Sequence, residues 1–214
     1  MLPIATNLLL DVPLSLDINS VKGFLDAEEG AALYQYAMAA AVMGPLLEVG
    51  SYCGKSSVYL GTACKLQKTI LFAVDHHRGS EEHQLGEEYH DPDLYDARFS
   101  KMDSFPQFRN TLARANLESV VVPIVASSVL AARYWSTPLA LVFIDGGHSM
   151  PAALNDYRSW AGHVMRGGFL VIHDVFQNPA DGGRPPFEIW KLAQESGLFE
   201  ALPLVKSLGI LQRL

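Results

Sequence analysis

Short apolar runs and helix-like segments alternate along most of the chain. The runs are rich in Val, Ile, Leu and Phe without a polar residue at every second position, which is typical of strands covered on both faces. They span residues 44–50, 69–75, 120–128, 139–148 and 167–175. Pro123 indicates a bend or an edge strand in the third of these runs. The helix-like segments span residues 21–42, 55–66, 105–117, 151–164 and 185–197.

Strands interleaved with helices in this way predict a parallel sheet in a doubly wound α/β fold. Beyond residue 175 the pattern changes, and two closely spaced runs at 199–205 and 208–214 predict a final strand pair that could be antiparallel. In an open α/β sheet, ligands bind beyond the carboxyl ends of the strands. Polar residues gather at those ends, including Asp75 and Asp145.

The turn after the first run, EVGSYCGKSS at 48–57, resembles the end of a phosphate-binding loop. It is one residue too short, because Gly50 stands four positions before Gly54 instead of five. Tyr52 occupies the middle glycine position of a dinucleotide-binding turn. A short turn with an acid just ahead suits an amino-acid tail, whose ammonium can pair with Glu48 and whose carboxylate can take backbone amides at the helix start.

Asp75 lies 25 residues after Gly50, at the end of the second predicted strand. An acid at this place hydrogen-bonds ribose hydroxyls. Ribose plus an amino-acid tail, without phosphate, describes S-adenosylmethionine. Two-glycine turns also occur without a ligand, so this prediction depends on the turn, Asp75 and the later acids together.

The motif EVGSYCGKSSV is very similar to the first motif of catechol O-methyltransferase and its relatives, the class I S-adenosylmethionine-dependent O-methyltransferases. The order of later motifs also matches, from residue 45 to about 175. FIDGGHS and GGFLVIHDV resemble more closely the bacterial macrocin O-methyltransferase-like group, which is found around sugar, antibiotic and glycan biosynthesis. The resemblance implies a Rossmann-like, mainly parallel seven-stranded sheet and a small hydroxylated acceptor, sugar-like or a secondary metabolite.

The same resemblance implies where the cofactor binds. Glu48 would lie by the methionine portion, Asp75 by the ribose, and His76 and Ser127 by the adenine. Ser127, or the serine after it, could instead be a helix N-cap. The full implied set is Glu48, Gly50, Ser51, Tyr52, Gly54, Ser56, Asp75, His76, Ser127 and Asp145.

Methyl transfer to a hydroxyl needs an aligned acceptor and help with its proton, from a general base or from a divalent metal. In the resembled enzymes, an Asp three residues before a Lys or His supplies a metal ligand and the base. Asp145 and His148 fall on these catalytic positions. His148 could alternatively form a cap-like hydrogen bond at a helix start.

The resemblance also implies a metal site of Asp145, His173 and Asp174, for Mg²⁺ or Mn²⁺. The family pattern has two oxygen ligands at the last two positions, so His173 is a departure. A histidine among carboxylates favours a softer ion than Mg²⁺, such as Mn²⁺ or Zn²⁺. Alternatively no metal binds, and His173 is a second base or a substrate contact.

We expect one domain over residues 1–214, with a helical extension at 1–43 and a substrate lid at 76–104. The lid segment is long and acidic, which would suit a neutral or cationic acceptor, but it could also be a solvated insertion. A second metal site from His83, Glu87 and His90 is a weaker alternative.

The net charge of −7 argues against a nucleic-acid partner. Two cysteines give no disulfide or zinc pattern. No basic start of a signal peptide and no apolar run of membrane-helix length occur, so we expect a cytoplasmic protein without a membrane partner. The apolar stretch 31–42 would allow a homodimer. The alternatives are a non-catalytic S-adenosylmethionine-binding protein, a metal-dependent hydrolase or oxygenase, and methylation of nitrogen or sulfur.

Overall fold

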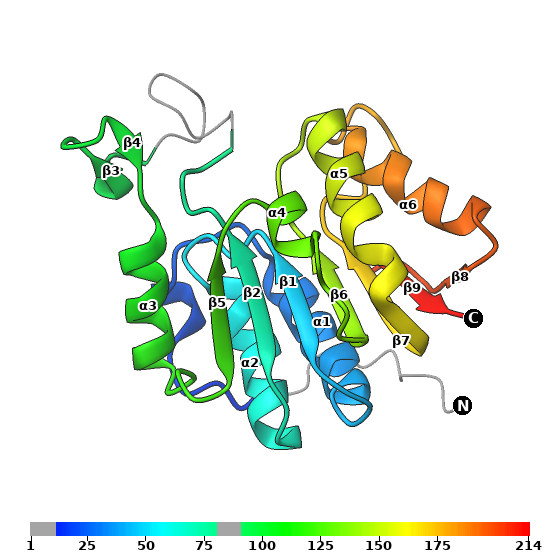
Figure 1. Ribbon diagram of the computed structural model, residues 1–214, viewed down its shortest axis with the longest axis horizontal. Coiled ribbons are helices and arrows are strands. Elements are labelled where there is room, and N and C mark those ends of the chain that lie inside the picture. Colours follow the sequence, from blue (N-terminus) through cyan, green and yellow to red (C-terminus); the bar gives the residue numbers. More distant parts are fainter. Residues whose placement is uncertain (1–11, 81–90) are drawn as a thin grey trace.

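The computed structural model describes residues 12–80 and 91–214. Its centre is a seven-stranded sheet with the order β5-β2-β1-β6-β7-β9-β8 (Figure 1). The strands are β1 (Leu46–Val49), β2 (Leu71–Asp75), β5 (Val121–Val125), β6 (Leu139–Ile144), β7 (Val164–Ile172), β8 (Phe199–Ala201) and β9 (Gly209–Arg213).

The five strands β5, β2, β1, β6 and β7 run parallel to one another. β9 is antiparallel to both β7 and β8. The expected seven-stranded, mainly parallel sheet with an antiparallel C-terminal pair is therefore confirmed. Pro123 lies in the edge strand β5, where the lack of an N–H on the outer side leaves no ladder bond unmade.

Helices cover both faces of the sheet (Figure 1). Neighbouring residues of a strand point to opposite faces, so Leu46 belongs to one core and Leu47 to the other. The first core is closed by α1 (Ala27–Ala40), α2 (Lys55–Gln67) and α3 (Phe105–Arg114). The second is closed by α4 (Ser128–Ala132), α5 (Met150–Trp160) and α6 (Pro185–Glu195).

Helix α1 starts later than the helical pattern at 21–42 indicates. Asp26 is its N-cap and forms a capping box with Glu29, which fixes the start at Ala27. Leu33 and Ala37 are fully buried against the sheet. Most of the apolar stretch 31–42 is therefore packed inside the fold, and the homodimer stays a prediction.

The segment at 76–104 is described in part. It contains the short helix η3 (Pro92–Leu94) and a small hairpin of β3 (Tyr95–Asp96) and β4 (Lys101–Met102), which stands apart from the main sheet in Figure 1. His83, Glu87 and His90 lie outside the described residues, and the lid stays a prediction. In residues 12–80 and 91–214, no helix combines the length and the apolar character that a membrane crossing needs.

Candidate active site

A cavity of about 520 Å³ lies at the carboxyl ends of β1, β2, β5, β6 and β7. This volume is within the range of small-molecule and cofactor sites. The sequence-predicted residues that line it are Gly50, Ser51, Tyr52, Ser56, Asp75, His76, Ser127, Asp145, His148, His173 and Asp174. Glu48 and Gly54 belong to the same turn but are not in the lining.

The glycine turn brings the ends of β1 and β6 into close contact. Gly50 has a φ of 85°, and a Cβ on it would come within 2.1 Å of the backbone oxygen of Asp145. Gly54, with a φ of 90°, is the N-cap of α2. Tyr52 adopts a φ of 45° between them, a conformation that is uncommon outside glycine. At Gly50, therefore, the backbone of the turn itself lines the cavity, because no side chain would fit there.

Glu48 corrects one expectation. Its side chain is fully buried and accepts hydrogen bonds from the hydroxyls of Ser56 and Ser57 in the first turn of α2. Burial raises the pKa of Glu48 to about 8. The carboxyl group points under the helix instead of into the cavity, so it cannot pair with the ammonium of a ligand there.

Ser51 and Asp75 form the wall that the sequence assigned to a cofactor. The hydroxyl of Ser51 is buried and has no hydrogen-bond partner among residues 12–80 and 91–214. Asp75 accepts hydrogen bonds from the backbone amides of Tyr52 at 2.8 Å and His77 at 2.7 Å, which tie the end of β2 to the glycine turn. Each carboxylate oxygen keeps acceptor capacity for a ligand hydroxyl.

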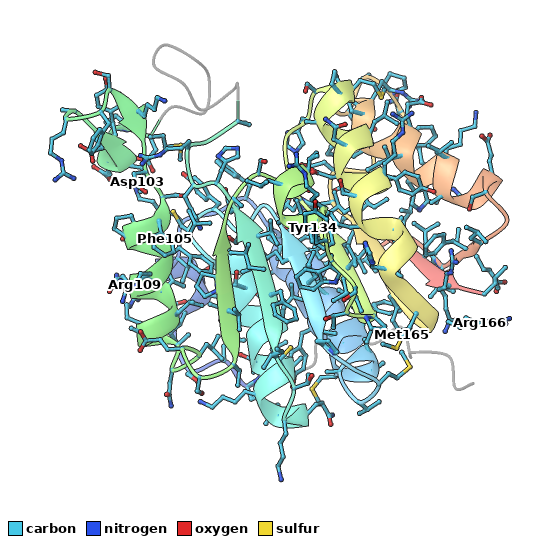
Figure 2. The ribbon with its side chains drawn as sticks, viewed as in Figure 1. Asp103, Phe105, Arg109, Tyr134, Met165 and Arg166 are labelled. Carbon is cyan, nitrogen blue, oxygen red and sulfur yellow. The ribbon has the colours of Figure 1, made fainter. Side chains whose placement is uncertain are left out.

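Two histidines follow Asp75 and differ in their surroundings. His76 is exposed and lines the cavity. His77 is buried, its Nδ1 lies 2.8 Å from the hydroxyl of Ser104, and its ring packs against Phe105 and Phe108. Figure 2 labels Phe105 at the start of α3. Of the two, only His76 can contact a ligand in the cavity.

Ser127 occupies the N-cap position of α4, but its side chain makes no capping hydrogen bond. The hydroxyl of Ser128 accepts a hydrogen bond of 2.8 Å from the indole N–H of Trp160. Both serines line the cavity. The N-cap interpretation is thus right for the position of Ser127, while its hydroxyl stays available to a ligand.

Asp145, His148 and Asp174 form a cluster just beyond the ends of β6 and β7. One potential ligand atom from each lies within 4.8 Å of the others. His148 Nε2 is 3.1 Å from Asp174 Oδ2. Burial alone would raise the pKa of Asp174, but the hydrogen bond from His148 and the charge of His173 outweigh it, and the pKa is lowered. Asp174 has a φ of 58°, a strained conformation of a kind that gathers at functional sites.

His173 lies outside this cluster, contrary to the expected metal site. Its ring is buried, with Nδ1 3.0 Å from Asp145 Oδ1 and Nε2 3.0 Å from Glu29 Oε2. Burial favours the neutral ring, but the charge of Asp145 and the hydrogen bonds to both carboxylates raise the pKa of His173 to about 11. Both ring nitrogens of His173 are thus directed at carboxylates, and in the described residues it is His148 that groups with Asp145 and Asp174.

Sequence reasoning missed Glu29. The backbone N–H and hydroxyl of Ser207 donate to its Oε1 at 2.9 and 2.7 Å. Burial would raise its pKa, but the hydrogen bonds from His173 and Ser207 lower the pKa to about 2. Glu29 lies three residues after Asp26, the spacing of a capping box, but nothing in the sequence places it beside residues 173 and 207.

Two other parts of the lining were also missed. Asp156 lies on α5, is 6% exposed and faces the cavity. The segment before α1 contributes Lys22 and Phe24, and the ring of Phe24 lies 6.1 Å from that of Tyr52. An acid within the helical pattern at 151–164 was the one sequence signal for Asp156.

Residues 47–175 match a family described as a methyltransferase domain. The chain belongs to this methyltransferase family. The expectation of a methyltransferase enzyme is therefore confirmed, and the matched residues include the glycine turn, Asp75 and the whole cluster at 145–174.

Solved structures of methyltransferases share the fold. The SAH-bound methyltransferase PaMTH1 of Podospora anserina is 12% identical with a TM-score of 0.63, over 89% of this chain and 80% of that one. A putative caffeoyl-CoA O-methyltransferase of Staphylococcus aureus is also 12% identical with a TM-score of 0.63, over 92% and 87%. An O-methyltransferase of Bacillus cereus in complex with SAH is 15% identical with a TM-score of 0.60, over 91% and 85%. At these identities the likeness establishes the Rossmann-like architecture.

Proposed function

We propose that this methyltransferase transfers the methyl group of S-adenosylmethionine to a hydroxyl of a small acceptor molecule. One observation carries the proposal. A single cavity joins the glycine turn and Asp75 to the cluster of Asp145, His148 and Asp174. If the cofactor binds at the glycine turn and Asp75, an acceptor that binds in the same cavity can contact the cluster.

The residues of the turn suit the cofactor. The unpartnered hydroxyl of Ser51 is a buried donor for a carboxylate. Asp75 offers acceptors for ribose hydroxyls. The solved Podospora anserina and Bacillus cereus proteins contain SAH, the demethylated product, and this supports the same ligand here.

When bound, S-adenosylmethionine supplies a methyl group on a sulfonium, whose C–S bond breaks as the acceptor oxygen forms the new C–O bond. The chain has to hold the acceptor in line and to take up its proton. His148 is the base for that proton. Asp174, 3.1 Å away, orients the imidazole and stabilises the imidazolium that forms.

A divalent cation is a second form of assistance, favoured by the close approach of three ligand groups. Asp145, His148 and Asp174 would hold it. Two carboxylates and one imidazole suit Mn²⁺ better than Mg²⁺, which prefers oxygen ligands alone. Such an ion would lower the pKa of the acceptor hydroxyl, and His148 would then be a ligand and not the base.

The segment that precedes α1 contributes to the lining of the cavity. Lys22 Nζ lies 2.6 Å from Asp91 and 2.8 Å from Asp93, so this segment is tied to the predicted lid at 76–104. The acidity of the lid and the net charge of −7 favour a neutral or cationic acceptor, such as an amino sugar, over a phosphorylated one.

Two measurements test the proposal. Calorimetry should detect SAH binding to the purified protein, and absence of binding would contradict it. A panel of hydroxylated acceptors, with amine and thiol analogues, should then show SAH release. Turnover that survives a chelator favours His148 as base, whereas turnover lost with chelator and restored by Mn²⁺ favours the metal. Cofactor binding without turnover on any acceptor would favour a non-catalytic binding protein.

A further inference from the structure

Asp156 is a buried acid of the cavity for which the proposed chemistry has no use. It lies on α5, and a Cβ on Gly146 would approach its Oδ2 to 2.4 Å, so the carboxyl group lies directly against the loop after β6. Ser128 hydrogen-bonds to it and in turn accepts the indole N–H of Trp160 at 2.8 Å. The Trp160–Ser128 chain therefore fixes the orientation of the carboxyl group.

No Lys or Arg of the described ranges forms an ion pair with Asp156, although the side chain is 6% exposed. Burial raises the pKa of Asp156 to about 6, while the hydrogen bond from Ser128 opposes this shift. A buried carboxyl group with one hydroxyl partner keeps unused acceptor capacity at a cost in stability. A ligand donor in the cavity would use that capacity.

Asp156 lies in the same part of the cavity as Asp75 and His76. Asp75 is near enough for its charge to raise the pKa of Asp156, and both line the cavity with His76 and Ser127. If the ribose binds at Asp75, the base attached to it must extend into this part. Asp156 is then the acidic side chain that the adenine of the cofactor contacts.

We propose that the carboxylate of Asp156 accepts a hydrogen bond from the exocyclic amino group of the cofactor's adenine and thereby selects adenine over a base with a carbonyl at that position. This inference rests on the proposed function, because it takes S-adenosylmethionine as the ligand. A carbonyl oxygen would place two acceptors against each other. Losing one hydrogen bond to a charged group corresponds to a discrimination of about 10- to 100-fold.

Calorimetry with two ligands tests the assignment. SAH carries the amino group, and S-inosylhomocysteine, its deaminated analogue, carries a carbonyl instead. The unmodified protein should bind SAH at least about 10-fold more tightly. In Asp156→Asn the amide can donate to the carbonyl, so the preference should fall to within about 3-fold. A merely structural role would weaken both ligands equally and leave their ratio unchanged.

The control is Asn155→Ala, which changes the neighbouring polar residue of the cavity lining and should keep the adenine preference. Asp156→Ser gives a second variant if the Asn variant does not fold, as judged by thermal unfolding. An unchanged ratio of the two Kd values in a folded Asp156 variant would overturn this inference but not the proposed function. Failure of the unmodified protein to bind either ligand would overturn both.

Discussion

Glu48 lies one residue before the end of β1 and Asp75 ends the neighbouring β2, but only Asp75 lines the cavity. The Glu48 carboxyl group lies under α2, where hydroxyls of Ser56 and Ser57 donate to it. The strand pattern places an acid at this position but does not tell whether its side chain turns toward the ligand or toward the following helix. Here the side chain turns toward the helix and is buried, and the burial raises the pKa of Glu48 to about 8.

Glu48→Gln should therefore change the pH dependence of stability. A folded-state pKa of about 8, above the unfolded value of 4.5, means that the folded protein holds an extra proton between these limits. The contribution of Glu48 to stability thus falls as pH rises from about 5 to about 8. Gln cannot ionise. The difference in free energy of unfolding between the variant and the unmodified protein, measured in denaturant, should therefore shift in favour of the variant as pH rises. The exposed Glu200→Gln variant is the control, and a pH-independent difference for Glu48→Gln would contradict the argument.

His148 is the residue on which turnover should depend most. If it is the general base, His148→Gln should lower the rate of methyl transfer by roughly 10²- to 10⁴-fold, while the Kd for SAH stays within a few-fold. The measurement pairs SAH release under saturating acceptor with calorimetry. His163→Gln, a histidine beyond α5 and outside the cavity lining, should retain full turnover. Equal turnover in both variants would exclude His148 from the chemistry.

At the scale of elements, the junction of α1 with β7 is held by the buried pair of Glu29 and His173. Removing one member leaves the other charge buried without its partner, which costs about 3–5 kcal/mol. Glu29→Ala should lower the free energy of unfolding by that amount, measured in denaturant. Asp26→Ala removes the partly exposed N-cap of the same helix and its surface ion pair with Lys206, and should cost about 1 kcal/mol. Equal losses would mean that Glu29 matters only as part of the cap.

The glycine turn gives a second contrast between matched positions. Gly50 and Gly197 both have a positive φ, 85° and 69°. A Cβ on Gly50 would collide with the backbone of Asp145, whereas one on Gly197 meets nothing within 4 Å. Gly197→Ala should cost about 1 kcal/mol for the conformation alone. Gly50→Ala should cost more and should also abolish SAH binding in calorimetry, and normal SAH binding by that variant would show that the turn does not shape the site.

The elements themselves were largely predictable, because buried parallel strands and helices leave periodic signals over several residues. The start of α1 was predicted too early, at residue 21, because the capping box of Asp26 and Glu29 fixes it at Ala27. What the sequence could not supply is which distant side chains meet. Glu29 reaches His173 and Ser207 only because α1, β7 and the loop before β9 are brought together by packing, and no local pattern encodes that contact.

At the scale of the whole molecule, the strand order places the cavity. From β1 the chain proceeds through β2 to β5 on one side of the sheet and then returns to β6 and β7 on the other. The loops after β1 and β6 therefore diverge, and ligands bind at such a reversal. This location followed from the predicted parallel sheet. The closure of the cavity by Lys22 and Phe24 did not, because their segment lies before the first helix and carries no ligand-binding pattern.

Because the cavity joins residues from five parallel strands and from the segment before α1, a ligand in it should stabilise the fold as a unit. A ligand that binds only the folded state adds RT ln(1 + [L]/Kd), about 2.7 kcal/mol at 100 times Kd. For a domain of this size, that corresponds to a rise in Tm of roughly 5–10 °C. SAH should produce this shift in thermal unfolding, and adenosine, which lacks the amino-acid tail for Ser51, should produce a smaller one at equal concentration. Equal shifts would mean that the glycine turn does not bind the tail.

If Mn²⁺ alone also raised Tm, and Asp174→Asn removed only that effect, the cluster would be a metal site independent of the cofactor.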